Sequence, residues 1–174
     1  MRLWGLVAAL LVLAGCGSPP APPKPQNSEA PEPAPVRRDK PWDDFETKLE
    51  KVFENGIEVS TKGHPGDGPA QIYASPWAAD ALRRLSAGRG VGTSAFRPGA
   101  LIVLQHPDGT LYVMRKRPLG RLPDTNDWYF ALVREGRSVL ESGTATGDQV
   151  QEACADCHST MAKASDWVVP PRLR

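Results

Sequence analysis

Two cysteines and a histidine stand together near the end of the chain, in the order Cys154-Ala155-Asp156-Cys157-His158. On a helix, thiols three residues apart lie almost one turn apart and point to the same side. That separation matches the two vinyl groups of haem, to which the thiols add in haem c, while the adjacent imidazole binds the iron. The pattern therefore predicts one covalently attached haem c, held by Cys154 and Cys157, with His158 as the axial ligand.

Two other kinds of site use the same residue types. A redox pair of the thioredoxin kind needs a βαβ setting near the motif, and a structural zinc ion needs two further ligands. The other two histidines, His64 and His106, stand in Gly/Pro-rich turns and form no zinc-like pair. We expect both on the surface, although a six-coordinate haem would need one such group as its second axial ligand.

The position of the motif limits where a second axial ligand can come from. Only 16 residues follow His158, so no long downstream segment can supply a distal methionine. Met161 stands too close to the motif to reach the opposite face of a haem. We therefore expect upstream residues to build the distal side, with Met114 as one candidate ligand.

The segments upstream of the motif have the pattern of strands. Runs of β-branched residues and leucines alternate with turns, including Asp108-Gly109. Sequential runs of this kind predict hairpins and therefore an antiparallel sheet with one face toward the core. The expected strands are residues 100–105, 111–116, 128–134 and 138–142, with weaker candidates at 57–61 and 70–74.

Apolar residues at helical spacing predict two helices before these hairpins. The first covers residues 41–54, and its apolar stripe consists of Trp42, Phe45, Leu49, Val52 and Phe53. The second covers residues 76–85 and should turn Trp77, Leu82 and Leu85 toward the core.

A third helix at the C-terminus should carry the haem motif. Thr146 can cap this helix, and Cys154 and Cys157 then share a face with Val150 and Ala153. The predicted fold class is therefore α+β: a β-rich antiparallel sheet with flanking helices, and a C-terminal helix that bears the haem c motif.

The first forty residues have the composition of a targeting segment and a tether. Arg2 precedes a short apolar run, which ends in Leu13-Ala14-Gly15-Cys16 and resembles the lipobox of bacterial lipoproteins. We expect a signal peptide at residues 1–15, a lipid on Cys16 and a disordered Pro-rich linker over residues 16–40. The haem c domain would occupy residues 41–174, anchored by lipid to a membrane of the bacterial envelope and facing the periplasm or the extracytoplasmic space.

The overall charge of the chain is close to zero and points to no electrostatic partner. The chain has 21 basic and 20 acidic side chains and a formal net charge of +1. No broad electrostatic field of either sign is therefore available to attract nucleic acid or acidic substrates.

Several short segments resemble the cytochrome P460 family and its relatives, the cytochromes c prime-beta, over roughly residues 45–169. The likeness rests on Phe96-Arg97-Pro98-Gly99, Tyr112-Val113-Met114-Arg115-Lys116, Asp127-Trp128-Tyr129-Phe130, the haem motif and Ala164-Ser165-Asp166-Trp167-Val168-Val169. It implies a β-rich domain with a five-coordinate haem c, often in homodimers. Some members oxidise hydroxylamine or nitric oxide, and others only bind nitric oxide or carbon monoxide.

The resemblance also directs attention to one lysine, because P460 enzymes join a lysine to the porphyrin. The strand at residues 100–105 has no lysine, its nearest matches being Leu104 and Gln105, so no cross-link is expected there. Lys116 is the remaining candidate for a cross-link or a distal residue. The competing interpretation is that the run from Arg115 to Arg117 is the solvated end of a strand.

Three functions remain open at this point. The first is a haem-dependent oxidoreductase acting on hydroxylamine or nitric oxide at an open distal site. The second is a binding protein for nitric oxide or carbon monoxide without turnover. The third is an electron-transfer cytochrome that exchanges electrons with a redox partner protein of the envelope.

Overall fold

The computed structural model describes residues 40–53, 59–60, 64 and 69–173. The expected signal peptide, the lipid site at Cys16 and the expected linker up to residue 39 lie outside these residues. Within the described part, no helix is both long and apolar enough to cross a membrane.

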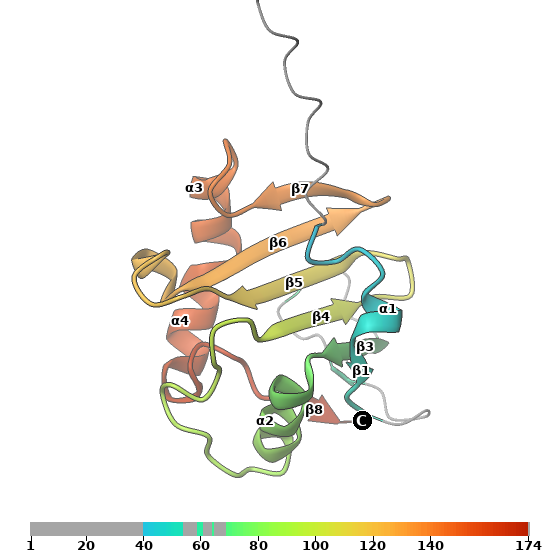
Figure 1. The fold of residues 1–174 in the computed structure, drawn as a ribbon, viewed down its shortest axis with the longest axis vertical. Helices are drawn as coiled ribbons and strands as arrows, with labels where there is room; N and C mark the ends of the chain where they lie inside the picture. Colours follow the sequence, from blue (N-terminus) through green and yellow to red (C-terminus); the bar gives the residue numbers. More distant parts are fainter. Residues whose placement is uncertain (1–39, 54–58, 61–63, 65–68, 174) are drawn as a thin grey trace, which may run out of the picture. The chain divides into compact units, whose positions relative to one another are not determined.

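An antiparallel sheet is the main element of the fold (Figure 1). Its strands follow the order β7-β6-β5-β4-β3-β2-β8, and β1 also pairs with β3. The strands are β1 Glu50–Lys51, β2 Val59–Ser60, β3 Pro69–Ala74, β4 Leu101–Gln105, β5 Leu111–Lys116, β6 Trp128–Arg134, β7 Arg137–Glu141 and β8 Arg172–Leu173. The expected hairpins from residue 100 to 142 are confirmed, as is the α+β class.

Short helices flank the sheet. They are α1 Phe45–Lys48, α2 Pro76–Ser86, α3 Gly147–Val150 and α4 Asp156–Ala162, with a π-helical segment η2 Gln151–Ala155 joining the last two. Two 3₁₀ turns, η1 Pro123–Thr125 and η3 Lys163–Ser165, complete the set in the described chain.

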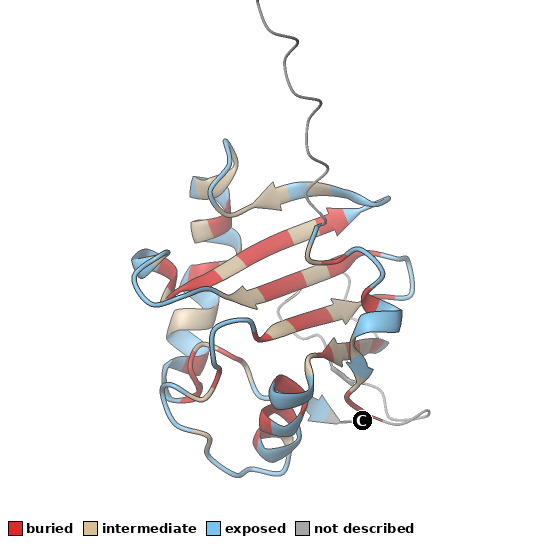
Figure 2. Cartoon of the chain, in the orientation of Figure 1, coloured by how far each residue is buried: buried red, intermediate tan, exposed pale blue. Residues whose placement is uncertain are grey.

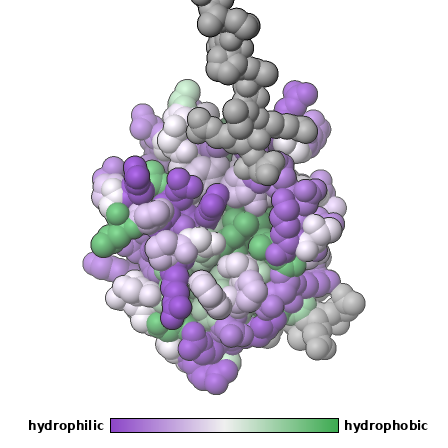
Figure 3. All heavy atoms as spheres, viewed as in Figure 1, coloured by the Kyte–Doolittle hydropathy of each residue, from purple (hydrophilic) through white to green (hydrophobic). Residues whose placement is uncertain are grey.

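The two faces of the sheet are covered by different parts of the chain, because side chains alternate along each strand. On the inner face, Ile102, Met114 and Phe130 join a core with α2 and the C-terminal helix. On the outer face, Val103 and Val113 pack against the segment around α1. Figure 2 shows the resulting buried residues along the middle strands, and Figure 3 shows that the outward surface is mostly polar with a small apolar area near β4 and β5.

The predicted helix over residues 41–54 is wrong. Only Phe45–Lys48 is helical, and Glu50–Lys51 then pairs with β3, extended by a hydrogen bond from Val52 N to Ile72 O of 2.8 Å. Phe45 packs on the outer face of the sheet and Val52 on the inner face. One helical stripe cannot reach both faces, so the chain becomes extended where it passes the edge of β3.

Helix α2 is confirmed, but the predicted inward direction of Trp77 is wrong. Leu82 and Leu85 are buried as expected, whereas Trp77 is 66% exposed and its ring lies 5.3 Å from the Arg97 guanidinium. The inward side of α2 is instead formed largely by alanines, which allow a close approach to the sheet. Trp77 stands one residue before these alanines and points to solvent.

The C-terminal helix is confirmed, although it is not a uniform α-helix. The π-helical turn Gln151–Ala155 stands directly before α4 and contains Cys154. Thr146 occupies the N-cap position without capping through its side chain, because its hydroxyl accepts a hydrogen bond from Glu141 N at 3.0 Å. Wider turns of this kind occur often at functional sites.

Candidate functional site

A cavity of about 250 Å³ is lined by the inner face of the sheet and by the C-terminal helix. Its sheet side is built from two rows of paired residues on β4, β5 and β6, because residues opposite each other in register share a face. These rows are Ile102, Met114 and Phe130, and Leu104, Tyr112 and Leu132. The wall is therefore apolar except for one phenol.

The three residues of the predicted haem motif line this same cavity. Cys154 and Cys157 come from η2 and α4, and His158 follows directly on α4. The prediction that both thiols share one side of the helix is confirmed in this respect. The His158 ring also meets Phe130 edge-on, with ring centres 5.3 Å apart.

A hydrogen bond to Trp167 fixes the orientation of His158. Its Nδ1 lies 2.7 Å from the carbonyl oxygen of Trp167. A carbonyl can only accept, so Nδ1 carries the proton and the neutral ring keeps its lone pair on Nε2. Burial lowers the pKa of His158, opposed by the hydrogen bond to Trp167. The arrangement favours the neutral imidazole that metals bind.

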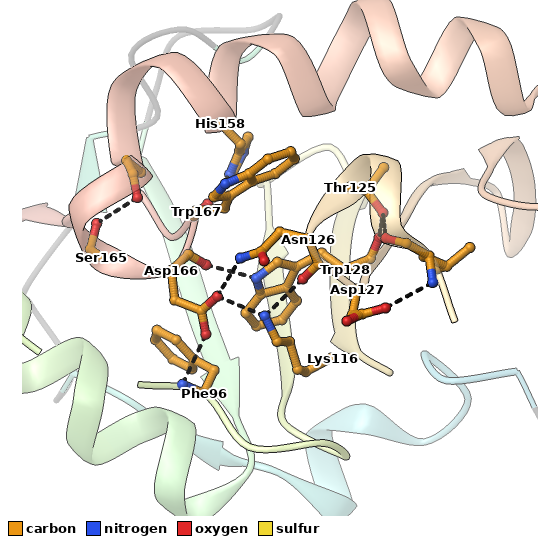
Figure 4. A network of polar contacts seen from close by, with 12 residues as sticks. Phe96, Lys116, Thr125, Asn126, Asp127, Trp128, His158, Ser165, Asp166 and Trp167 are labelled. Carbon is orange, nitrogen blue, oxygen red and sulfur yellow. Dashed lines mark hydrogen bonds and ion pairs between the residues drawn. The ribbon is translucent and has the colours of Figure 1, made fainter. Parts of the chain in front are cut away.

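The carbonyl that holds His158 belongs to a turn organised by Asp166. The Asp166 side chain is fully buried and accepts hydrogen bonds from Lys116 Nζ at 2.6 Å, Asn126 Nδ2 at 2.7 Å and Phe96 N at 3.1 Å. Its own carbonyl accepts from Trp128 Nε1 at 2.7 Å. We call Lys116, Asn126, Trp128 and Asp166 the Asp166 cluster; Figure 4 shows it beside His158.

Two turns with unusual backbone meet in this cluster. Asp166 and Trp167 have φ of 53° and 65°, and Asn126 and Asp127 have φ of 51° and 60°. Asparagine and aspartate tolerate these values better than other non-glycine residues do, whereas Trp167 adopts them at a cost of about 1–3 kcal/mol. The hydrogen bond from Asn126 to Asp166 joins the two turns, so each helps to hold the other in place.

Lys116 is neither solvated nor directed into the cavity. Its side chain is 11% exposed, and its ammonium donates to Asp166 and to Asn126 O and lies 5.0 Å from the Trp128 ring centre. The interpretation of residues 115–117 as a solvated strand end is therefore wrong for Lys116. The described residues that line the cavity include no lysine.

The two thiols differ in their surroundings. Burial raises the pKa of Cys154 to about 11, and the neighbouring Cys157 adds to the effect. Cys157 is exposed, with its Sγ 3.5 Å from Met161 Sδ. Both cysteines are free thiols.

The expectation that His64 and His106 lie on the surface is wrong. His64 lines the cavity with its ring centre 6.1 Å from that of His158 and 4.5 Å from that of Tyr112. His106 is 5% exposed and lies behind Tyr112, at 5.3 Å. Burial, followed by the charges of His158 and His106, lowers the pKa of His64 to about 4.

The structure also bears on the two other kinds of site considered for these residues, a thioredoxin-like redox pair and a structural zinc site. Every strand pair in the described sheet is antiparallel, so the motif does not stand in a βαβ unit there. The described residues contain no group of three or more His, Cys, Asp or Glu side chains arranged to hold a metal ion.

Of all parts of the site, the Asp166 cluster behind His158 was the hardest to predict from the sequence. Asp127 accepts hydrogen bonds from Gly120 N and Leu122 N within its own turn, whereas Asp166 accepts one from Phe96 N, 70 residues earlier. No sequence signal linked Asp166 to Lys116, which stands 50 residues earlier.

Comparisons with known proteins add no relative to this picture. No family model matches the chain, and no curated protein matches it significantly.

Proposed function

We propose that this protein is a haem c protein that binds small nitrogen compounds, such as nitric oxide or hydroxylamine, at the iron. The observation that carries the proposal is the meeting of Cys154, Cys157 and an oriented His158 at one apolar cavity. A haem would supply an iron atom that binds and can exchange electrons with such ligands.

The chemistry of the residues fits a covalently attached haem. Two thiols line the same cavity as the imidazole, and the hydrogen bond to Trp167 leaves Nε2 of His158 as the nitrogen for the metal. Metal-binding histidines commonly donate their other ring N–H to a carbonyl or carboxylate in this way. The apolar rows of β4, β5 and β6 would cover the porphyrin and keep water from it.

The composition of the cavity favours binding over oxidation. Ile102, Leu104 and Phe130 offer no proton donor or acceptor, and no lysine lines the cavity in the described part of the chain. Uncharged diatomic molecules such as nitric oxide and carbon monoxide tolerate such surroundings. Oxidation of hydroxylamine also requires proton removal; the sheet wall provides no base for it, which leaves His64 as the one imidazole besides His158 among the described residues that line the cavity.

An electron-transfer role is the second candidate, because Met114 lines the same cavity as His158. A thioether on the far side of the iron would raise its potential and close the site to gases. Replacing Met114 by leucine would then change the spin state of the iron.

The test is an absorption spectrum of the full chain, expressed in a host that matures haem c. We expect haem that stays with the polypeptide after denaturation, and a ferrous protein that binds carbon monoxide and nitric oxide. The Cys154→Ser and Cys157→Ser double variant should lose the covalent attachment, whereas Ser159→Ala, a half-buried neighbour on α4, should keep it.

Colourless protein with two titratable thiols would refute the haem assignment. Incubation with hydroxylamine and an electron acceptor separates binding from turnover, and we expect no turnover.

A further inference from the structure

A second imidazole lines the same cavity as His158. His64 comes from the part of the chain before β3, far from the haem motif in sequence, and its ring lies at an angle of 43° to that of His158. His106 also packs against Tyr112, with ring centres 5.3 Å apart, but it does not line this cavity.

The spacing of the two rings suits a shared metal ion. With metal–nitrogen bonds of about 2.0 Å, two imidazoles on opposite sides of one ion have ring centres roughly 6 Å apart. The centres of His64 and His158 lie 6.1 Å apart. The ring of His64 and that of Tyr112, by contrast, are 4.5 Å apart and pack directly on each other.

The surroundings of His64 leave it able to bind a further group. Its Nδ1 is buried and has no hydrogen-bond partner within the described residues. Leaving a buried polar atom unpaired costs free energy, so such atoms commonly serve a ligand or a catalytic role. Tyr112 supports one side of the ring and limits its movement toward the sheet.

We infer that His64 is the sixth ligand of the haem iron and that small ligands bind by displacing it. The inference rests on the proposed function, since it requires a haem on His158. In the resting protein both axial positions would then be filled by imidazole, which makes the iron low-spin. A gas must then compete with His64 for the iron. Only the protein molecules whose His64 has left the iron can bind the gas, so the apparent affinity for the gas is the intrinsic affinity multiplied by that fraction.

The spin state of the iron tests this inference without any measurement of activity. We expect the ferric wild-type protein to show the absorption and electron paramagnetic resonance spectra of a low-spin iron with two imidazoles. His64→Leu should be high-spin, and added imidazole should restore the low-spin spectrum. Carbon monoxide should bind to the ferrous variant at least about ten times faster, because no ligand has to leave first.

Two matched variants make the assignment specific. His106→Leu removes a buried histidine beyond Tyr112 and should leave the spectra unchanged, and Met114→Leu removes the other candidate ligand and should also leave them unchanged. A high-spin wild type with attached haem would overturn the role of His64 and leave the proposed function standing. Low-spin spectra that persist in His64→Leu, or that vanish in Met114→Leu, would overturn it as well. Absence of attached haem would instead refute the proposed function.

Discussion

The two sides of His158 are built on opposite principles. Behind the ring, Asp166 and Trp128 are fully buried, and the Asp166 carboxylate and carbonyl accept hydrogen bonds from Lys116, Asn126 and Trp128. In front of it, the cavity is lined mostly by aliphatic and aromatic side chains, and the buried Nδ1 of His64 has no hydrogen-bond partner among the residues that the structure describes.

This difference assigns separate tasks to the two ring nitrogens. Nδ1 is held by the Trp167 carbonyl, which the Asp166 cluster keeps in place, while Nε2 is left for a ligand. A polar group whose hydrogen bonds are all made holds its neighbours in place, whereas a polar group with an unused donor or acceptor remains available for a ligand. Variants on each side should therefore fail in different ways, by loss of folding behind the ring and by altered binding in front of it.

The largest effect is expected from Asp166→Ala. The change leaves the Lys116 ammonium buried without its anion, and breaking a buried pair in this way costs about 3–5 kcal/mol. The free energy of unfolding in urea measures the loss. Asp124→Ala is the control, because Asp124 is exposed in the neighbouring turn and should change stability by less than about 0.5 kcal/mol. Equal stability of the two variants would mean that the cluster does not hold the turn.

A smaller effect is expected from Trp128→Phe, compared with the same substitution at Trp77. Trp128 is fully buried, and losing its N–H leaves the Asp166 carbonyl unpaired at a cost of about 1–3 kcal/mol. Trp77 is exposed, so Trp77→Phe should stay within about 0.5 kcal/mol of the wild type. Chemical denaturation followed by circular dichroism measures the free energy of unfolding of both variants. A larger loss for Trp77→Phe than for Trp128→Phe would contradict the structural role given to Trp128.

The sheet could be predicted from the sequence because its signals are local. The runs of β-branched residues and leucines, together with the Asp108-Gly109 turn, specify the β4–β5 hairpin. The shared side of Cys154 and Cys157 on the C-terminal helix also follows from helical spacing. Such features depend on neighbours in the chain and need no knowledge of the tertiary structure.

The errors arose where distant segments decide the outcome. Residues 50–51 pair with β3 and are therefore extended, although residues 41–54 have a helical pattern of apolar residues. Lys116, at the charged end of β5, is bound by Asp166 from the C-terminal turn. The position of His64 depends likewise on Tyr112 of β5. No periodicity within a segment contains this information, because each contact joins residues far apart in sequence.

The smallest effect concerns acid, and it tests whether carboxylates hold the turns behind His158. Hydrogen bonds from Leu122 N and Gly120 N, in that order of importance, lower the pKa of Asp127 despite the opposing effect of burial. A carboxylate with a lowered pKa stabilises the fold above its ordinary pKa of about 3.9, and this contribution is lost as the pH falls through the folded value. Asp127→Asn should therefore be less stable than the wild type at pH 6, and the difference should shrink below about pH 4. Urea midpoints between pH 6 and pH 3 measure it, with Asp124→Asn as the exposed control. A constant difference across this range would show that Asp127 acts through its shape and not through its charge.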